Sequence, residues 1–346
     1  MLKLKLIHAK LILVLSIAMI VAVLPAKGQT PPKLRVIDIK DLYIRDPFIV
    51  ADLEAKTYFL YKAGKVEGSD GSEVNGVEAY KSEDLKKWEG PYDVFAIPPD
   101  NWIDGVVWAP EVHHYRGKYY LFATLNSEIE WKKRRENWPA YTFRGTQIFY
   151  ADSPLGPFLP FDDKMPHTPM DKMALDGTLW EENSLPYMIY CHEWVQIEDG
   201  AMELIQLAPD LSKVIGVSQK LFNAFVAPWS TGTHREMGPS SYVTDGCFLY
   251  RKKTDKLLMI WSSFKENSYA IGIAESVTGK VSGPWIQQKD LLFSQNGGHG
   301  MLFKTFEGQL MLTFHGPNSP AGSERMLIFE IEDLGSTLKL KKQLFK

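Results

Sequence analysis

The sequence predicts an all-β protein, a five-bladed β-propeller with antiparallel four-stranded blades. Five segments, each opening on a polar residue and continuing as an apolar run, recur at intervals of 65, 65, 69 and 54 residues. Each segment is followed, after a short polar turn, by a second apolar run rich in aromatic residues. The runs alternate with period two, and no convincing amphipathic helix interrupts them, which favours strands throughout.

The five units are predicted in chain order from these openings. They begin as RDPFIV at Arg45, APEVHHY at Ala109, LDGTLW at Leu175, TDGCFLY at Thr244 and GHGMLF at Gly298. Their second runs are TYFLYKA, KYYLFAT, PYMIYCHEW, KLLMIWSSF and QLMLTFHG. The first strand of each propeller blade lines the central channel, so we expect the five polar members to occupy one slot and to meet at one mouth. These residues are Asp46, Glu111, Asp176, Asp245 and His299. A β-sandwich, the rival fold, does not need a polar residue at this point of every repeat.

Residues 1–28 are predicted to be a secretory signal peptide. Lysines at positions 3, 5 and 10 accompany an apolar stretch from Leu11 to Leu24, and the small-residue pattern Ala26-Lys27-Gly28 follows. The apolar stretch is short for a membrane span, and no second one follows. We therefore expect residues 29–346 to form one propeller domain, secreted or periplasmic and not held in a membrane.

Charge and cysteine content narrow the class of partner. Without the four lysines of residues 1–28, the formal net charge falls from −3 to about −7. A mildly acidic chain is not expected to bind nucleic acid or an anionic membrane. The two cysteines, Cys191 and Cys247, each lie in an apolar run. They are expected to form either one buried disulfide or two inert thiols, and a disulfide-rich scaffold is excluded.

The ordered set RDPFIV, WAPEVHHYRGKYYLF, LDG and GGHGMLF resembles glycoside hydrolase family 43. The resemblance covers nearly all of residues 29–346, and the segments occur in the family's order and spacing. It implies a five-bladed propeller that hydrolyses arabinose-, xylose- or galactose-containing polysaccharides with inversion. Inversion needs one carboxylate to activate water and one carboxylic acid to protonate the leaving oxygen.

The resemblance also implies roles for the carboxylates. Asp46 matches the general base, and Asp176 matches the aspartate that raises the pKa of the acid through its like charge. Asp245 stands where the family usually presents a glutamate as general acid, and its shorter side chain shortens the reach by about 1.5 Å, enough to affect proton transfer. Glu193 in CHEW is the other candidate, because the end of a second strand returns to the mouth. Both assignments stay open on the sequence alone.

Further residues are predicted to bind substrate or metal. The expected substrate contacts are Arg45, Trp108, Glu111, His192, Trp194 and Arg325, with Trp229 and Trp102 as further aromatic candidates. His299 resembles the family histidine that holds a central calcium through waters, or it forms a hydrogen bond within the channel. No organic cofactor is implied. Two insertions, residues 126–144 and 224–240, are expected to be loops that shape the pocket.

The leading interpretation is a secreted inverting glycosidase. Because blade four departs from the family pattern at Asp245, a carbohydrate-binding propeller without hydrolytic activity is the alternative. The sequence does not choose between the three sugars or between attack at chain ends and within the chain, nor does it give the oligomeric state.

Overall fold

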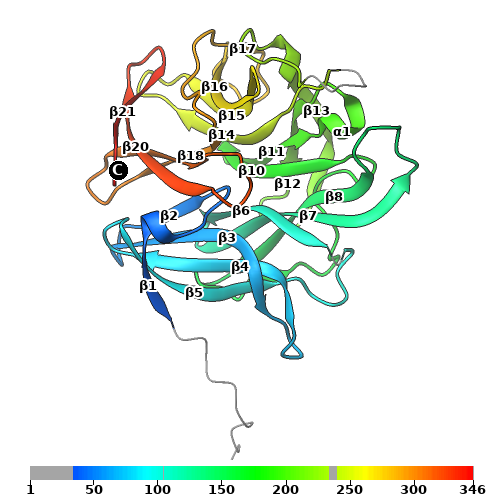
Figure 1. Ribbon diagram of the computed structural model, residues 1–346, viewed down its shortest axis with the longest axis vertical. Coiled ribbons are helices and arrows are strands. Elements are labelled where there is room, and N and C mark those ends of the chain that lie inside the picture. Colours follow the sequence, from blue (N-terminus) through cyan, green and yellow to red (C-terminus); the bar gives the residue numbers. More distant parts are fainter. Residues whose placement is uncertain (1–33, 104, 234–239, 346) are drawn as a thin grey trace, which may run out of the picture. The chain divides into compact units, whose positions relative to one another are not determined.

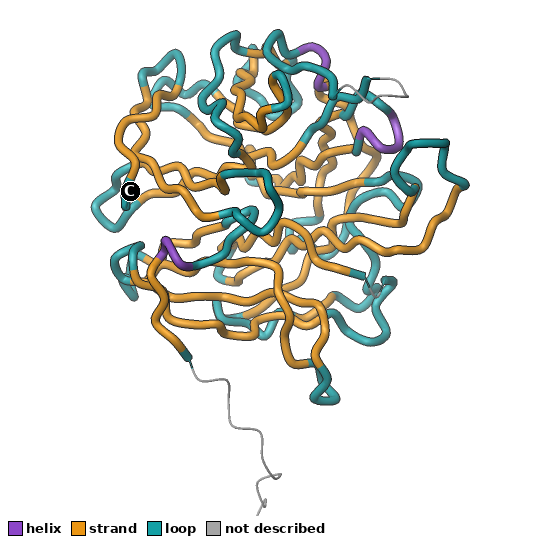
Figure 2. The backbone as a smooth tube through the Cα atoms, in the orientation of Figure 1, coloured by secondary structure: helices purple, strands orange, loops and turns teal. Residues whose placement is uncertain are grey.

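The computed structural model describes residues 34–103, 105–233 and 240–345. The predicted signal peptide, residues 1–28, lies outside this part of the chain. The described residues are almost entirely strands and turns, with only short helical segments (Figure 2). None of the helices in these ranges is long and apolar enough to cross a membrane.

The strands form five antiparallel sheets that follow one another around a common centre in chain order (Figure 1). The predicted five-bladed propeller is therefore confirmed. Blade one contains β2 (Phe48–Asp52), β3 (Thr57–Glu67), β4 (Glu73–Ser82) and β5 (Lys87–Ala96), with β1 (Arg35–Asp38) added beside β5 and the short helix η1 (Ile39–Asp41) after β1. Blade two contains β6 (Val106–Tyr115), β7 (Lys118–Lys132), β8 (Tyr141–Ala151) and β9 (Leu159–Pro160).

The other three blades have four strands each. Blade three contains β10 (Ala174–Glu182), β11 (Leu185–His192), β12 (Ala201–Leu207) and β13 (Val214–Asn223), with the single-turn helix α1 (Trp194–Ile197) after β11. The short helix η2 (Ala224–Val226) precedes blade four, which contains β14 (Asp245–Arg251), β15 (Leu257–Lys265), β16 (Ser268–Ser276) and β17 (Trp285–Gln287). Blade five contains β18 (Gly298–Lys304), β19 (Leu310–Gly316), β20 (Arg325–Asp333) and β21 (Leu338–Gln343).

The hydrophobic core lies between the blades. One cluster of buried side chains fills each of the five blade interfaces among the described residues, and a sixth, smaller cluster joins the β7–β8 hairpin to α1. The first strands β2, β6, β10, β14 and β18 contact one another in a closed ring. This ring brings the openings of all five sequence repeats to the centre, as the spacing predicted.

Blades one and five close the ring without exchanging a terminal strand, because β1 pairs with β5 and β21 pairs with β20. Their interface is a shared apolar cluster together with a β-bridge between Tyr43 and Arg325. The Arg45 guanidinium also pairs with Glu324 across this interface at 2.9 Å. The seam of the ring thus runs next to the first of the predicted site residues.

Candidate active site

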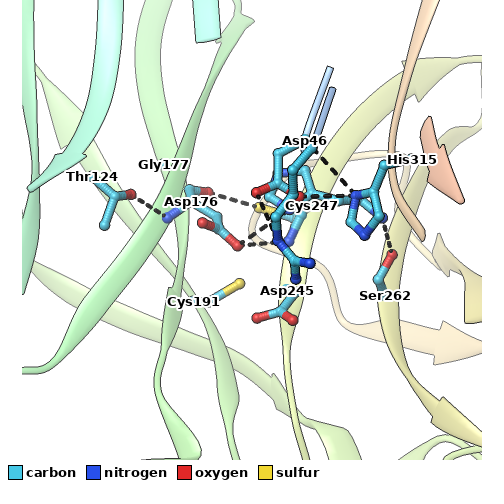
Figure 3. Close-up of polar contacts among 12 residues, drawn as sticks. Asp46, Thr124, Asp176, Gly177, Cys191, Asp245, Cys247, Ser262 and His315 are labelled. Atoms are coloured by element: carbon cyan, nitrogen blue, oxygen red, sulfur yellow. Dashed lines mark hydrogen bonds and ion pairs between the residues drawn. The ribbon is translucent and has the colours of Figure 1, made fainter. Parts of the chain in front are cut away.

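A cavity of about 750 Å³ lies at the mouth of the ring. Four carboxylates line it, from Asp46, Asp176, Glu193 and Asp245, and His299 completes this polar wall. Figure 3 shows Asp46, Asp176 and Asp245 converging from three different blades, with His315 beside Asp46. The structure therefore brings together both sequence candidates for the general acid.

In blades two and four, the residue at the repeated position near the start of the first strand is not the predicted one. One residue near the start of each first strand has a positive φ, and these residues are Asp46 (49°), Ala109 (40°), Asp176 (54°), Gly246 (50°) and His299 (57°). In blades two to five it lies in a β-bulge, where the register with the second strand shifts. The expectation that Glu111 and Asp245 share the slot with Asp46 was wrong. Asp245 comes one residue before the slot, level with Arg45 and Trp108, and Glu111 comes two residues after it.

Three of the slot residues are fixed by a side chain from the preceding blade. The backbone N–H of Asp176 donates to Thr124 Oγ1 at 2.8 Å, and that of His299 donates to Ser262 Oγ at 2.8 Å. The N–H of Asp46 faces His315 Nδ1 at 3.3 Å. Each acceptor lies on the second strand of its blade, which runs antiparallel to the first. The functional side chains are thus held by contacts between blades.

Asp46 is held in its ionised form. Burial by itself would raise its pKa, but His299, His315 and Arg45 outweigh burial and hold the pKa well below the usual range of an aspartate. Its Oδ1 lies 3.0 Å from His315 Nδ1 and 3.3 Å from His299 Nδ1, and its Oδ2 lies 3.8 Å from Arg45 Nε. The carboxylate is therefore ionised at neutral pH, which is the form that a general base needs.

The surroundings of Asp176 and Asp245 raise their pKa and so favour the protonated form. Burial, followed by the charge of Asp46, raises the pKa of Asp176 well above its usual value. Burial and the charges of Asp176 and Asp46 raise the pKa of Asp245 to about 7. Tyr269 Oη donates to Asp245 Oδ2 at 3.1 Å. Both carboxyls therefore hold a proton at pH values at which Asp46 has already lost its own.

The family model described as glycosyl hydrolases family 43 matches residues 39–330. The chain belongs to this family. The expected family and the expected enzyme class, a glycosidase, are thereby confirmed, and membership implies a carbohydrate substrate.

Three individual proteins are similar to this chain in structure or in sequence. The solved structure of an endo-arabinase from Bacteroides thetaiotaomicron VPI-5482 is 37% identical, covers 86% of this chain and 96% of its own, and has a TM-score of 0.74. An endo-1,4-β-xylanase structure from the same organism, 20% identical over 88% of this chain and 98% of its own with a TM-score of 0.66, shares the fold. The extracellular endo-α-(1→5)-L-arabinanase 1 of Bacillus subtilis (strain 168) is 32% identical over 66 residues, which are 17% of this chain and 20% of that relative.

Glu193 of this family 43 chain is paired with an arginine that the sequence analysis missed. It follows β11 directly and is almost fully buried, and its Oε2 accepts from Arg144 Nη1. Burial raises the pKa of Glu193 to about 7, against the pull of Arg144 and with the help of the Asp245 charge. Arg144 is also buried and lies with its guanidinium carbon 4.8 Å from the Trp108 ring centre. Protonating Glu193 would leave Arg144 buried without its counter-charge.

The predicted substrate contacts fall into two groups. Arg45, Trp108 and Trp194 line the cavity. Glu111, His192 and Arg325 are not among the residues that line it, and their contact with substrate stays a prediction. Glu111 Oε2 forms a hydrogen bond with His113 Nε2 at 2.9 Å, and His192 Nδ1 forms one with Glu203 Oε1 at 3.1 Å. Arg325 Nε donates to the Lys40 carbonyl at 3.1 Å.

The two other tryptophans have packing roles. Trp229 is buried in the cluster between blades three and four, with its ring centre 4.8 Å from that of Trp261. Trp102 Nε1 donates to Gln147 Oε1 at 2.9 Å, and its ring packs against the cluster between blades one and two. Neither lines the cavity.

The insertion at residues 126–144 is an extended β-hairpin and not the expected loop, because β7 and β8 continue into it. Its end is tied to α1, since Trp138 Nε1 donates to the Val195 carbonyl at 2.7 Å and Arg135 pairs with Glu198 at 2.6 Å. The hairpin thereby delivers Arg144 to Glu193. Of the second insertion, residues 234–239 lie outside the described residues, and Thr233 lines the cavity.

The donors around His299 do not fit direct calcium ligation. His299 Nδ1 faces Asp46 Oδ1 at 3.3 Å and Asp176 Oδ2 at 3.8 Å. Within the part of the chain that the structure describes, no group of three or more His, Cys, Asp or Glu side chains is arranged to hold a metal ion. Calcium prefers oxygen ligands in a shell of six to eight, which this set does not supply. A calcium held only through waters stays a prediction, and no step below depends on it.

The two cysteines are free thiols, the second of the two expected states. Both are buried, and Cys247 Sγ lies 3.6 Å from the Asp176 carbonyl oxygen. Burial raises the pKa of the Cys191 thiol well above its usual value, which makes it a poor nucleophile. These side chains pack behind the carboxylates (Figure 3).

Sequence reasoning also missed His315 and Tyr269. His315 lies at the end of the second run QLMLTFHG, the same place in its blade from which Glu193 was inferred in blade three. Applying that rule to every blade would have found it. Tyr269 lies on a third strand, where no pattern in the sequence indicates that its hydroxyl reaches the cavity.

Proposed function

We propose that this family 43 glycosidase is a secreted, inverting enzyme that cleaves α-1,5-linked L-arabinan within the chain. The observation that carries the proposal is one cavity in which His299, His315 and Arg45 hold the pKa of Asp46 well below its usual range, while burial raises the pKa of Asp176 and of Asp245. An inverting glycosidase needs these two opposite protonation states. The choice of arabinan rests on the 37% identity with the endo-arabinase from Bacteroides thetaiotaomicron, which extends over nearly all of that chain.

In the proposed reaction, Asp46 takes a proton from a water molecule, whose oxygen attacks the anomeric carbon. The bond from this carbon to the glycosidic oxygen breaks, and Asp245 transfers its proton to the departing oxygen. We assign the acid to Asp245 because no cation pairs with it among the described residues, whereas Glu193 is paired with Arg144. When Asp176 is ionised, its charge raises the pKa of the acid. Trp108 and Trp194 offer aromatic faces on which the apolar face of a sugar stacks.

The proposal is tested with linear α-1,5-arabinan and with xylan as the matched substrate. Wild type is expected to release arabino-oligosaccharides from arabinan before free arabinose, and to leave xylan intact. Proton NMR during the first turnovers is expected to show a product of inverted anomeric configuration. Asp46→Asn is expected to bind arabinan but to release nothing. Binding of arabinan by wild type without any release would instead support the carbohydrate-binding propeller.

Secretion is part of the proposal and is tested separately. It is supported by the pattern of residues 1–28 and by the extracellular relative from Bacillus subtilis. Expression of the full chain in a bacterial host, followed by N-terminal sequencing of the exported protein, is expected to show a new N-terminus near Gln29. An intact N-terminus in the cytoplasmic fraction would contradict it.

A further inference from the structure

Tyr269 is a buried tyrosine that lines the cavity. It lies at the start of β16, the third strand of blade four, and pairs with Phe264 across the hairpin that joins β15 to β16. Its Oη donates to Asp245 Oδ2 at 3.1 Å, and among the described residues this hydroxyl has no other hydrogen-bond partner. The third strand of the blade thus contributes one donor to the carboxyl at the start of the first strand.

The packing around Tyr269 fixes the direction of its hydroxyl. The ring of Phe264 lies with its centroid 5.2 Å from that of Tyr269, and the His315 ring is stacked on Tyr269 with centroids 5.7 Å apart. A Cβ at Gly298 would lie 2.4 Å from Tyr269 Cε1, so the glycine leaves room for the ring. A side chain that is locked by packing in this way is a preorganised donor for the group that it contacts.

The hydrogen of the phenol determines which oxygen of Asp245 carries the acid proton. Burial, followed by the charge of Asp245, raises the pKa of Tyr269 well above its usual value, so the phenol keeps its hydrogen. A hydroxyl has one hydrogen, and the bond to Oδ2 uses it. If Oδ2 instead donated to the phenol, the phenol hydrogen would need another acceptor, and the described residues offer none. The acid proton therefore belongs on Oδ1.

We propose that Tyr269 is a positioning residue for the general acid Asp245. Its hydroxyl holds Oδ2, so Oδ1 carries the proton and delivers it to the departing glycosidic oxygen, while the phenol keeps its own hydrogen. As the proton leaves, Asp245 becomes negative and the bond from Tyr269 becomes charge-assisted, which makes it stronger. The contact therefore stabilises the acid most where its charge develops. The inference rests on the proposed hydrolysis for the role of Asp245.

The other groups around Asp245 act on its charge and not on its direction. Besides Tyr269, the charged and titratable groups that influence this carboxyl, or are influenced by it, are Asp46, Asp176, Glu193, His299, Arg45 and the Cys191 thiol. Within the described ranges, the one hydrogen bond to the carboxyl comes from Tyr269. Removing the hydroxyl thus removes the directional contact and leaves the surrounding charges in place.

Two substrates distinguish positioning of the acid from a structural role. Tyr269→Phe removes the hydroxyl and keeps the ring, so the circular dichroism spectrum should not change. We expect kcat on linear α-1,5-arabinan to fall by about 10–100-fold with little change in KM, because the acid is misplaced. On a nitrophenyl arabinofuranoside, whose leaving group needs no proton, the loss should be much smaller. Equal losses on both substrates overturn the positioning role.

Tyr250→Phe is the matched control. Tyr250 Oη donates to Asp333 Oδ2 at 3.2 Å in the interface between blades four and five, and Tyr250 is not among the residues that line the cavity. The substitution removes the same atom from a similar tyrosine–aspartate contact. We expect kcat to stay unchanged on both substrates. A loss on arabinan as large as that in Tyr269→Phe would overturn the assignment to the acid.

Carbon NMR of ¹³C-labelled aspartate carboxyls tests the contact without a substrate. In wild type the pKa of Asp245 is raised to about 7. Loss of a donor disfavours the ionised form, so Asp245 should titrate at higher pH in Tyr269→Phe. Asp245→Asn assigns the signal. A titration that stays in place overturns the contact. If wild type cleaves neither substrate, the proposed function fails, and the NMR result still decides whether Tyr269 holds Asp245.

Discussion

The backbone N–H of Gly246 donates a hydrogen bond to Asp176 Oδ2 over 3.0 Å. This bond joins the bulges that open the first strands of blades three and four. It fixes the carboxylate of Asp176 next to the peptide that follows Asp245, so a charge on one aspartate acts on the proton of the other. The acid and its modulator are coupled through the blade interface.

Replacing Asp176 by Asn is expected to lower the pKa of Asp245. In wild type, burial and the charges of Asp176 and Asp46 raise that pKa to about 7. The acid must be protonated, so the alkaline limb of the kcat profile should move to lower pH. A shift of about one to two pKa units reduces the protonated fraction at pH 7 by roughly five- to fiftyfold. An alkaline limb that stays in place in Asp176→Asn would contradict the coupling.

The dependence on leaving group distinguishes the two candidate acids. Asp245→Asn is expected to lower kcat/KM on arabinan by about 10²–10⁴-fold, the usual contribution of a general acid. On an aryl arabinofuranoside with a nitrophenolate leaving group, which needs no proton, the loss should be much smaller. Glu193→Gln is the matched variant, and its loss should be similar on both substrates. The reverse pattern would assign the acid to Glu193.

Loss of the Glu193 charge is expected to destabilise the fold. Glu193→Gln leaves Arg144 buried without its partner, and breaking a buried pair in this way costs about 3–5 kcal/mol in the free energy of unfolding. Glu198→Gln is the control, because it removes the half-exposed pair with Arg135 that joins the same hairpin to α1. Such pairs contribute about 1 kcal/mol or less. Urea denaturation of both variants measures the difference, and equal losses would rule out a special role for the buried pair.

Gly246 is expected to tolerate no side chain. It has a φ of 50°, and a Cβ would lie 2.7 Å from His299 Cγ. Gly246→Ala therefore combines about 1–2 kcal/mol for the left-handed conformation with about 1–3 kcal/mol for overpacking. Gly117→Ala is the control, since its φ is 82° and nothing lies within 4 Å of the added atom. Thermal unfolding should show the larger loss in Gly246→Ala, and arabinan hydrolysis should fall only in that variant.

The number of blades, and the carboxylates and the histidine that line the cavity, could be predicted from the sequence. Alternation with period two identifies strands, and the fold places the start of each first strand and the end of each second strand at the mouth. Asp46, Asp176, Asp245, Glu193 and His299 could therefore be predicted as neighbours, although they are far apart along the chain.

The register of the slot and the partners of its carboxylates could not be predicted from the sequence, because both depend on how the blades pack. A β-bulge adds one residue without leaving a pattern in the sequence, so Ala109 and Gly246 could not be recognised as the equivalents of Asp46. Arg144 and His315 reach the site from a hairpin and from a neighbouring blade, and Glu111 and Arg325 are turned toward protein partners. Which face of a strand is covered, and by which charge, depends on the packing between blades, and that packing sets which carboxylate keeps its proton.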